Sequence, residues 1–211
     1  IGIPVYHTSL ESSGASASGV RRALNAQGKN DTTVLVMAGD GGTYDIGFQA
    51  LSSAVERNED ILYICFDNEG YMNTGGQKSA STPLHAATGS TPAGKVSKKK
   101  NIIEMLAAQE IPYVATASPG HLEDMANKVE KAMAIKGMRF IAVNIPCLPG
   151  WGLEDNQGIT SSRLAVECGM FPLYEVENGY KYTLNWKNKD NSVDEYLKMQ
   201  KRYRHLTEEA I

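Results

Sequence analysis

The stretch Thr33-Val34-Leu35-Val36-Met37-Ala38, which runs directly into Gly39-Asp40-Gly41-Gly42-Thr43, decides the fold class of this chain. Its first six residues are β-branched or apolar without a break, a pattern that predicts a strand buried on both faces. The glycines that follow predict a tight turn, and the residues from about Gly47 to Arg57 predict a helix. A buried strand that enters a helix through a glycine turn is the start of a βαβ unit.

The same alternation of strands and helices continues outward from this stretch. Further strands are predicted at Ile61–Phe66, Tyr113–Ala117 and Phe140–Ile145, and further helices at residues 12–28, Asn101–Gln109, His121–Ile135 and Thr160–Cys168. This order predicts an α/β fold with a mainly parallel sheet and helices on both faces.

Two segments stand outside this alternation. Residues 71–100 are polar and show no periodicity, and a loop of about 30 residues inside a compact domain is either functional or disordered. Residues 153–211 are charged and tyrosine-rich, with a final helix predicted near Val193–Tyr203. We therefore expect one main domain, residues 1–152, followed by a helical or irregular arm, residues 153–211, that contacts another subunit.

The composition of the 211 residues excludes several classes of protein. With a formal net charge of −3 the chain shows no basic surface for nucleic acid, and its one basic run, Lys98-Lys99-Lys100, is expected on a solvated face. No apolar stretch approaches the ~20 residues that span a bilayer. Three cysteines, Cys65, Cys147 and Cys168, cannot form a disulfide framework and fit a reducing environment. We expect a cytoplasmic protein without nucleic-acid or membrane partners.

Two strand ends carry residues that suit a bound diphosphate. In an open parallel sheet, ligands lie beyond the carboxyl ends of the strands. At the first end, the glycines of Gly39-Asp40-Gly41-Gly42 let the backbone approach a phosphate, and the next helix directs its first amides toward it. The carboxylate of Asp40 would repel a diphosphate unless a divalent cation lay between them. At the second end, Asn68 and a backbone carbonyl such as that of Gly70 offer Mg²⁺ further oxygen ligands.

This pairing of Gly-Asp-Gly with an Asn at the next strand end, 28 residues after Asp40, is the diphosphate signature of thiamine-diphosphate enzymes. A tight turn and a strand-terminating Asn, without any ligand, remain the alternative. A dinucleotide-binding Gly-x-Gly-x-x-Gly motif is not formed, because Tyr44 stands at the position of the third glycine. A P-loop is also excluded here, because no Gly-Lys-Ser/Thr follows.

The residues after the second strand, Asp67-Asn68-Glu69-Gly70-Tyr71-Met72-Asn73-Thr74-Gly75-Gly76-Gln77-Lys78-Ser79, resemble the Tyr-x-Asn-Thr-Gly-x-Gln-x-Ser run of pyruvate:ferredoxin oxidoreductases and related 2-oxoacid:ferredoxin oxidoreductases. Residues 39–47 and 111–118 resemble the same family, and the similarity covers essentially the whole chain, less clearly after about Leu153. In this family the β subunit, or the equivalent domain of a fused chain, binds thiamine diphosphate and its metal ion. The resemblance therefore implies the thiamine-diphosphate-binding fold.

The resemblance also implies roles for individual residues. Asp40 and Asn68 would be side-chain ligands of Mg²⁺, with the Gly70 carbonyl as a third, and Asn73 would bind the diphosphate. The alternative for Asn73–Gly76 is a plain glycine-assisted turn. The implied cofactor contacts are Gly39, Asp40, Gly41, Gly42, Asn68, Gly70, Tyr71, Met72, Asn73 and Thr74, with Gln77 and Ser79 nearby.

The segment Pro146-Cys147-Leu148-Pro149-Gly150-Trp151 resembles the family's Pro-Cys-Pro-x-Gly-Trp segment, whose cysteine ligates a four-iron, four-sulfur cluster, although Leu148 replaces a proline. The resemblance implies that role for Cys147, whereas a cysteine in such a position is by itself more often structural. Family β subunits carry their other cluster ligands upstream, including a Cys-x-x-Cys pair. No cysteine precedes Cys65 here, and Cys65 and Cys168 are expected in the core. Either a segment with the other ligands lies outside this sequence, or the chain has no cluster.

The implied reaction is oxidative decarboxylation of a 2-oxo acid, with electrons passed through the cluster to ferredoxin and the acyl group to coenzyme A. Pyruvate is the default substrate, while 2-oxoisovalerate, 2-oxoglutarate and oxalate stay open. No acidic residue here, Glu11 included, is an obvious activator of the cofactor. The resemblance therefore places the activating glutamate on an α-type partner subunit of a hetero-oligomer. His7 is expected to be an ordinary surface or core residue.

Two other functions remain as alternatives. A non-redox thiamine-diphosphate decarboxylase or synthase would need Asp40 and Asn68 but not Cys147. A non-catalytic α/β nucleotide-binding or scaffold module would bind no metal and would leave residues 71–100 disordered.

Overall fold

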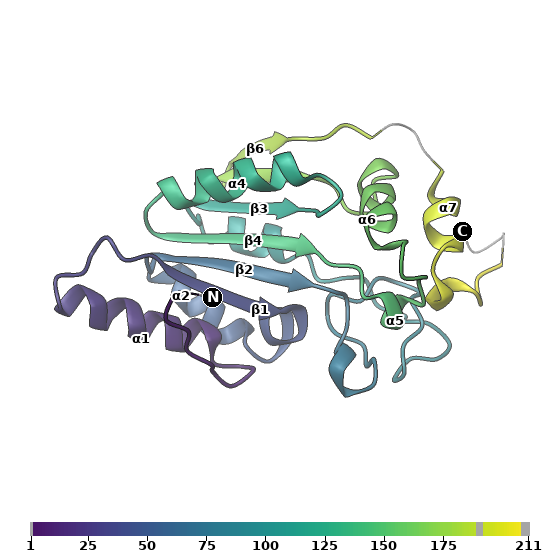
Figure 1. Cartoon of the computed structure of the whole chain (residues 1–211), viewed down its shortest axis with the longest axis horizontal. Helices are drawn as coiled ribbons and strands as arrows, with labels where there is room; N and C mark the ends of the chain where they lie inside the picture. The colour runs from purple at the N-terminus through teal and green to yellow at the C-terminus, as the bar shows by residue number, and fades with distance from the viewer. Residues whose placement is uncertain (1, 189–191, 208–211) are drawn as a thin grey trace.

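The structure is a computed structural model that describes residues 2–188 and 192–207 (Figure 1). Its centre is a six-stranded sheet made of β1 (Val34–Gly39), β2 (Ile61–Asp67), β3 (Tyr113–Ala117), β4 (Met138–Asn144), β5 (Tyr174–Glu177) and β6 (Lys181–Leu184). The strand order is β1-β2-β4-β3-β5-β6. The first four strands in this order are parallel, and β5 and β6 add an antiparallel hairpin at the β3 edge.

Helices cover both faces of the sheet. They are α1 (Ser13–Ala26), α2 (Phe48–Glu56), α3 (Ile102–Ala107) and α4 (Leu122–Ala134). On one face, the first three pack on strand residues such as Tyr63 and Phe140. On the other, α4 packs on strand residues such as Leu62 and Ile141. Because successive side chains of a strand point to opposite faces, neighbouring residues serve the two layers. The predicted α/β fold with a mainly parallel sheet is confirmed.

Strand β1 is buried on one face only, so the prediction of a fully buried strand is wrong. Val34 and Val36 are buried, but Leu35 and Met37 are 44% and 60% exposed. β1 is the edge strand beyond β2, and α4 packs on β3 and β4 instead. An uninterrupted apolar run predicts a strand, but it does not reveal whether a helix reaches the second face.

The segment after residue 152 contains more strand than predicted. It adds α6 (Gly158–Glu167), α7 (Val193–Lys198) and the 3-10 turn η3 (Lys201–Tyr203), as well as β5 and β6. The helices and the turn share a cluster of their own, around buried residues such as Phe171 and Tyr196. Cys168 packs partly against this cluster, whereas Cys65 is fully buried in the main core. The two strands form because β5 pairs with β3, a partner far away in the sequence.

Residues 71–100 fold onto the sheet, although their regular structure is limited to a short 3-10 turn, η2 (Met72–Thr74). Ser79 Oγ donates a hydrogen bond to Asp40 Oδ2 at 2.5 Å. The ammonium group of Lys95, which is buried, donates to three backbone carbonyls of the segment. Polar contacts with the strand ends and within the segment therefore give it a defined course, and the disordered alternative is wrong.

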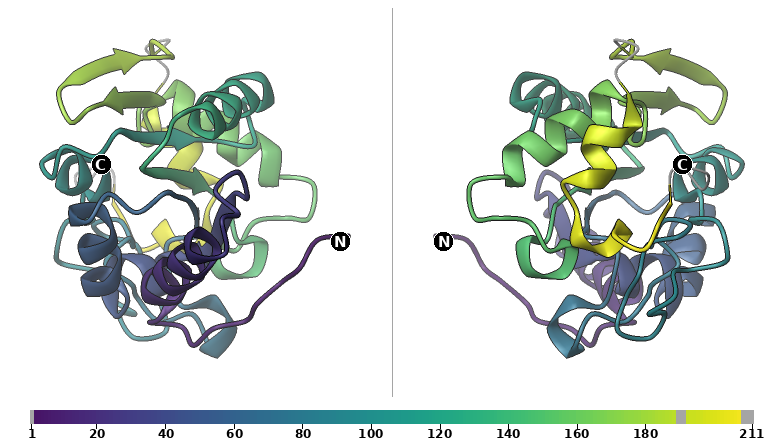
Figure 2. Two further views of the ribbon diagram at one scale, coloured as in Figure 1. Left: turned by 90° about the vertical axis from the view of Figure 1, so that its left-hand side faces the viewer. Right: turned by 90° about the vertical axis from the view of Figure 1, so that its right-hand side faces the viewer.

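The carboxyl ends of the four parallel strands point to one side of the molecule (Figure 1). Residues 71–100, the short helix α5 (Leu148–Trp151) and α7 gather at that side (Figure 1). The chain before α1 runs outward from the body, and the β5–β6 hairpin forms one edge (Figure 2). Within the described part of the chain, none of the helices combines the length and the apolar character needed to cross a bilayer.

Candidate cofactor and metal site

The ends of β1 and β2 bring Asp40, Asn68 and Gly70 together. Parallel pairing aligns Gly39 with Phe66, so the residues after them meet at the same edge of the sheet. One terminal atom of the Asn68 amide lies 2.7 Å from the Gly70 carbonyl oxygen and 2.9 Å from Asp40 Oδ1. If this atom is the nitrogen, it donates to both oxygens; if it is the oxygen, three oxygens converge and need a cation. This set of oxygen donors fits Mg²⁺.

Asp40 is a buried carboxylate whose direct partner is a hydroxyl group. It is 1% exposed, and it accepts the hydrogen bond from Ser79. Burial, and then the nearby Asp67 carboxylate, raise the pKa of Asp40 from 3.8 to about 7. Among residues 2–188 and 192–207 no group of three or more His, Cys, Asp or Glu side chains could hold a metal. A cation here would therefore rely on one carboxylate and neutral oxygens, and it would neutralise that carboxylate.

The glycine-rich segment after β1 is helical, not the predicted tight turn. Asp40 has φ −61° and ψ −42°, and Gly41–Asp45 form a π-helical turn, η1, that leads toward α2. The ring of Tyr71 packs on Gly41, where a Cβ would come within 2.2 Å of it. The Tyr71 hydroxyl lies 3.2 Å from the Gly41 carbonyl oxygen and 3.1 Å from Asp45 Oδ2. Glycine is thus required because two segments approach closely.

The other predicted cofactor contacts lie at the rim of this site. Met72 is half-buried, and Asn73 and Thr74 are exposed. Met72 and Asn73 line a cavity of about 700 Å³ together with the half-buried Cys147. Of the predicted glycine contacts, Gly41, Gly42 and Gly70 are buried, whereas Gly39 is exposed. The structure therefore joins the cofactor segment and the predicted cluster cysteine in one cavity.

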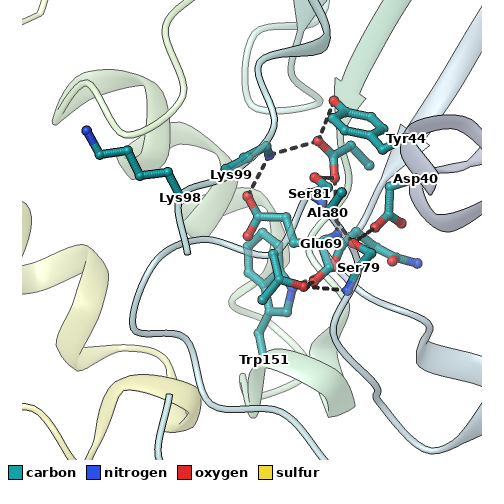
Figure 3. A network of polar contacts seen from close by, with 12 residues as sticks. Asp40, Tyr44, Glu69, Ser79, Ala80, Ser81, Lys98, Lys99 and Trp151 are labelled. Carbon is teal, nitrogen blue, oxygen red and sulfur yellow. Dashed lines mark hydrogen bonds and ion pairs between the residues drawn. The ribbon is translucent and has the colours of Figure 1, made fainter. Parts of the chain in front are cut away.

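A network of charged side chains adjoins the turn formed by residues 68–70, and Figure 3 shows the contact of Lys99 with Glu69. Lys99 Nζ lies 2.8 Å from Asp67 Oδ2 and 3.0 Å from Glu69 Oε1. Arg202 Nη2 lies 2.7 Å from Glu69 Oε2, and Glu69 is 4% exposed. Burial opposes the charged form of Glu69, but Lys99 and Arg202 outweigh it and lower the pKa of this carboxyl group.

Lys99 is a residue whose position the sequence analysis predicted wrongly. Lys98 points away from the site, whereas Lys99 turns inward to Glu69 (Figure 3). A run of three lysines gives no sign of which side chain meets a buried carboxylate. Arg202, 133 positions after Glu69, had no local signal either. Only the fold brings these charges together.

Trp151 joins the Cys147 segment to the turn at residues 68–70. Its indole Nε1 donates a hydrogen bond to the Asn68 carbonyl at 2.8 Å. The guanidinium carbon of Arg202 lies 3.9 Å from the centroid of its ring, an arrangement typical of a cation–π contact. Trp151, four residues after Cys147, therefore contacts the backbone of the candidate metal site.

Comparisons with known proteins place the chain in a family. Residues 3–143 match the family model described as "Thiamine pyrophosphate enzyme, C-terminal TPP binding domain". The chain is 51% identical to pyruvate synthase subunit PorB of Methanocaldococcus jannaschii, over 99% of this chain and 74% of that protein. It is 45% identical to ketoisovalerate oxidoreductase subunit VorB of Pyrococcus abyssi, over 98% of this chain and 70% of that protein.

The chain belongs to the β subunits of the 2-oxoacid:ferredoxin oxidoreductases. The family that the two strand ends predict is thereby confirmed. The fold of the β subunit is also found in a 2-oxoglutarate:ferredoxin oxidoreductase from Magnetococcus marinus, with a TM-score of 0.61 and 22% identity over 89% of the β subunit and 66% of that chain.

Membership rejects one of the functional alternatives. The β subunit is part of a thiamine-diphosphate-dependent oxidoreductase, so the non-catalytic scaffold alternative is wrong. The matched residues include both strand ends, with Asp40 and Asn68. The family model stops at residue 143, before Cys147, so the role of Cys147 stays a prediction.

Proposed function

We propose that this β subunit holds Mg²⁺ and the diphosphate of thiamine diphosphate at the ends of β1 and β2. The observation that carries the proposal is the approach of the Asn68 amide to Gly70 O and Asp40 Oδ1, at 2.7 and 2.9 Å. Asp40 and Asn68 would be the side-chain ligands of the cation, and Gly70 would provide a carbonyl ligand. The cation would neutralise the buried carboxylate and attract the diphosphate.

Neighbouring residues would form the rest of the cofactor pocket. The segment Gly39-Asp40-Gly41-Gly42 would bring backbone close to the diphosphate, because three of its residues lack side chains. Tyr71 and Met72 would line the pocket. Asn73, exposed at the rim, would donate a hydrogen bond to the diphosphate. The Thr74 hydroxyl donates to Gln77 Oε1 at 2.5 Å, and it would exchange that acceptor for the diphosphate.

Thiamine diphosphate, when bound, supplies the carbon nucleophile and the electron sink for decarboxylation. The proposed reaction is oxidative decarboxylation of a 2-oxo acid with coenzyme A as acyl acceptor. Pyruvate is the first candidate, because the relative at 51% identity is named for pyruvate, and the one at 45% for ketoisovalerate. The activating glutamate would come from an α-type partner subunit, as the family resemblance implies.

Cys147 is the proposed ligand of a [4Fe–4S] cluster that passes electrons to ferredoxin. Its half-buried thiol shares a cavity with Met72 and Asn73 of the cofactor segment. A cluster at this position would lie close to the cofactor, and its potential would depend on the hydrogen bonds and burial around the thiolate. The three free cysteines of the described chain support a cytoplasmic location.

The content of the intact complex tests the proposal. The complex that contains this β subunit is purified without oxygen, and its thiamine diphosphate, iron and acid-labile sulfide are measured. Thiamine diphosphate with about four irons or more per β subunit supports both sites. If thiamine diphosphate is found without iron, the ferredoxin-linked reaction is rejected and a non-redox decarboxylase or synthase is supported. If neither is found, the cofactor site is rejected.

A further inference from the structure

Glu69 has an unusual backbone and lies between two proposed ligands of Mg²⁺, Asn68 and Gly70. Its φ is 65°, a left-handed conformation that residues with a side chain rarely adopt. Strained residues of this kind persist where the surrounding structure over-determines them. The groups that hold the Glu69 side chain therefore help to decide the course of the turn at residues 68–70.

Two cations from distant parts of the chain hold the Glu69 carboxylate. Lys99 Nζ lies 3.0 Å from Glu69 Oε1, and it also forms an ion pair with Asp67 Oδ2 at 2.8 Å. Arg202 binds Oε2 at 2.7 Å. The side chain of Lys99 is 28% exposed, whereas that of Arg202 is 4% exposed. Loss of one partner from a buried ion pair is strongly destabilising, because it leaves the other charge buried and unpaired. We therefore expect the contact of Glu69 with Arg202 to matter more than its contact with Lys99.

Arg202 also supports the other side of the turn. Its guanidinium group stacks on Trp151 at 3.9 Å, and the Trp151 indole donates to the Asn68 carbonyl at 2.8 Å. Gln200 Oε1 accepts a hydrogen bond from Arg202 Nε at 2.8 Å and fixes the guanidinium group. One side chain of the C-terminal segment thus holds Glu69 directly and the Asn68 backbone through Trp151.

We infer that Arg202 is a positioning residue for the metal site: its contacts with Glu69 and Trp151 keep the turn at residues 68–70 closed on Asp40. The inference rests on the proposed magnesium site. It gives the C-terminal segment a function inside the subunit, because the affinity for Mg²⁺, and through it for thiamine diphosphate, then depends on a residue far from both strand ends in sequence.

Substitution of Arg202 in the intact complex tests the inference. The complex is stripped with EDTA, and thiamine diphosphate binding is measured by equilibrium dialysis at increasing Mg²⁺ concentration. Arg202→Met keeps an apolar chain against Trp151 but loses the charge, and the Mg²⁺ concentration at half-saturation should rise about tenfold. Arg202→Lys keeps the charge and should recover part of that shift.

Arg139→Met is the matched control. Arg139 is also a buried arginine paired with a carboxylate, Asp60, but the pair lies at the amino ends of β2 and β4. Arg139→Met should lower the melting temperature without changing the Mg²⁺ concentration at half-saturation, which we call the midpoint. Trp151→Phe removes the indole N–H and one of the two fused rings, and it should raise the Mg²⁺ concentration at half-saturation about threefold even if Arg202→Met fails to assemble.

The possible results separate the inference from the proposed function. A midpoint that moves in Arg202→Met but not in Arg139→Met supports the inference. A midpoint unchanged by both Arg202→Met and Trp151→Phe, or equal shifts in the two arginine variants, overturns it and leaves the metal site intact. A wild-type complex without Mg²⁺-dependent binding of thiamine diphosphate overturns the proposed function, and the inference with it.

Discussion

Two neighbouring regions, the ends of β1 and β2 and the rim around Cys147, differ in how firmly the chain holds their side chains. The side chains at the strand ends have more partners within the chain. At the strand ends, Asp40 is buried and bonded to Ser79, and the Asn68 amide lies within hydrogen-bonding distance of Asp40. At the rim, Asn73 is exposed and Cys147 is half-buried beside a cavity of about 700 Å³. Buried side chains with internal partners keep their positions without a ligand, whereas exposed ones are ordered by what binds them.

Removal of the carboxylate at the strand ends should have the largest effect. Asp40→Asn keeps the shape of the side chain but removes the charged ligand, so the affinity for thiamine diphosphate in the presence of Mg²⁺ should fall about 100-fold or more. Equilibrium dialysis of the EDTA-treated complex measures this affinity. The melting temperature of the cofactor-free complex should not fall, because a buried charge is removed. Unchanged binding would contradict the proposed role of Asp40.

Loss of the rim cysteine should affect a different quantity. Cys147→Ala should remove the cluster, about four irons per β subunit, because one thiolate ligand is lost. Thiamine diphosphate binding should change less than twofold. Iron, sulfide and cofactor are measured on the same sample, with Cys168→Ala as control. Equal losses of cofactor and iron would show that the two regions do not act independently.

Ser79 tests how far the hydrogen bond to Asp40 pre-organises the metal site. Ser79→Ala should lower the affinity for Mg²⁺ about tenfold, because groups that orient a metal ligand commonly have effects of 10- to 100-fold. It should also lower the free energy of unfolding by about 1 kcal/mol. Ser90 is an exposed serine whose Oγ accepts a hydrogen bond from Lys78 N. Ser90→Ala should change neither quantity appreciably, and equal effects of both variants would argue against pre-organisation.

The exposed rim should give the smallest change. Asn73→Ala removes one proposed hydrogen bond to the diphosphate, so the affinity for thiamine diphosphate should fall on the order of threefold. The free energy of unfolding, measured in urea, should change by no more than about 0.5 kcal/mol, because the Asn73 side chain is exposed. A large loss of stability would mean that the rim is as firmly built as the strand ends.

Local sequence patterns predicted the repeating part of the fold well. The strand predicted at Tyr113–Ala117 coincides with β3, and the helix predicted at His121–Ile135 differs from α4 by one residue at each end. β5 and β6 were missed, since they have four residues each and all four of β6 are exposed. Such strands exist because a partner lies beside them, and their own residues carry little periodicity.

The sequence by itself determined which residues are suited to the site. Asp40, Asn68 and the glycines can be identified from residue type and spacing, because parallel strands place their carboxyl ends at one edge of the sheet. The family also follows from these local motifs. Chemistry carried by a short motif at a strand end is visible without coordinates.

Only the tertiary structure decided what surrounds these residues. The need for glycine at position 41 follows from contact with Tyr71, and the inward position of Lys99 follows from its pairing with Asp67 and Glu69. The pairing of Arg202 with Glu69 spans 133 positions of the chain. The physical reason is the same in each case: burial and electrostatic attraction act between groups that are close in space, and sequence distance carries no information about them.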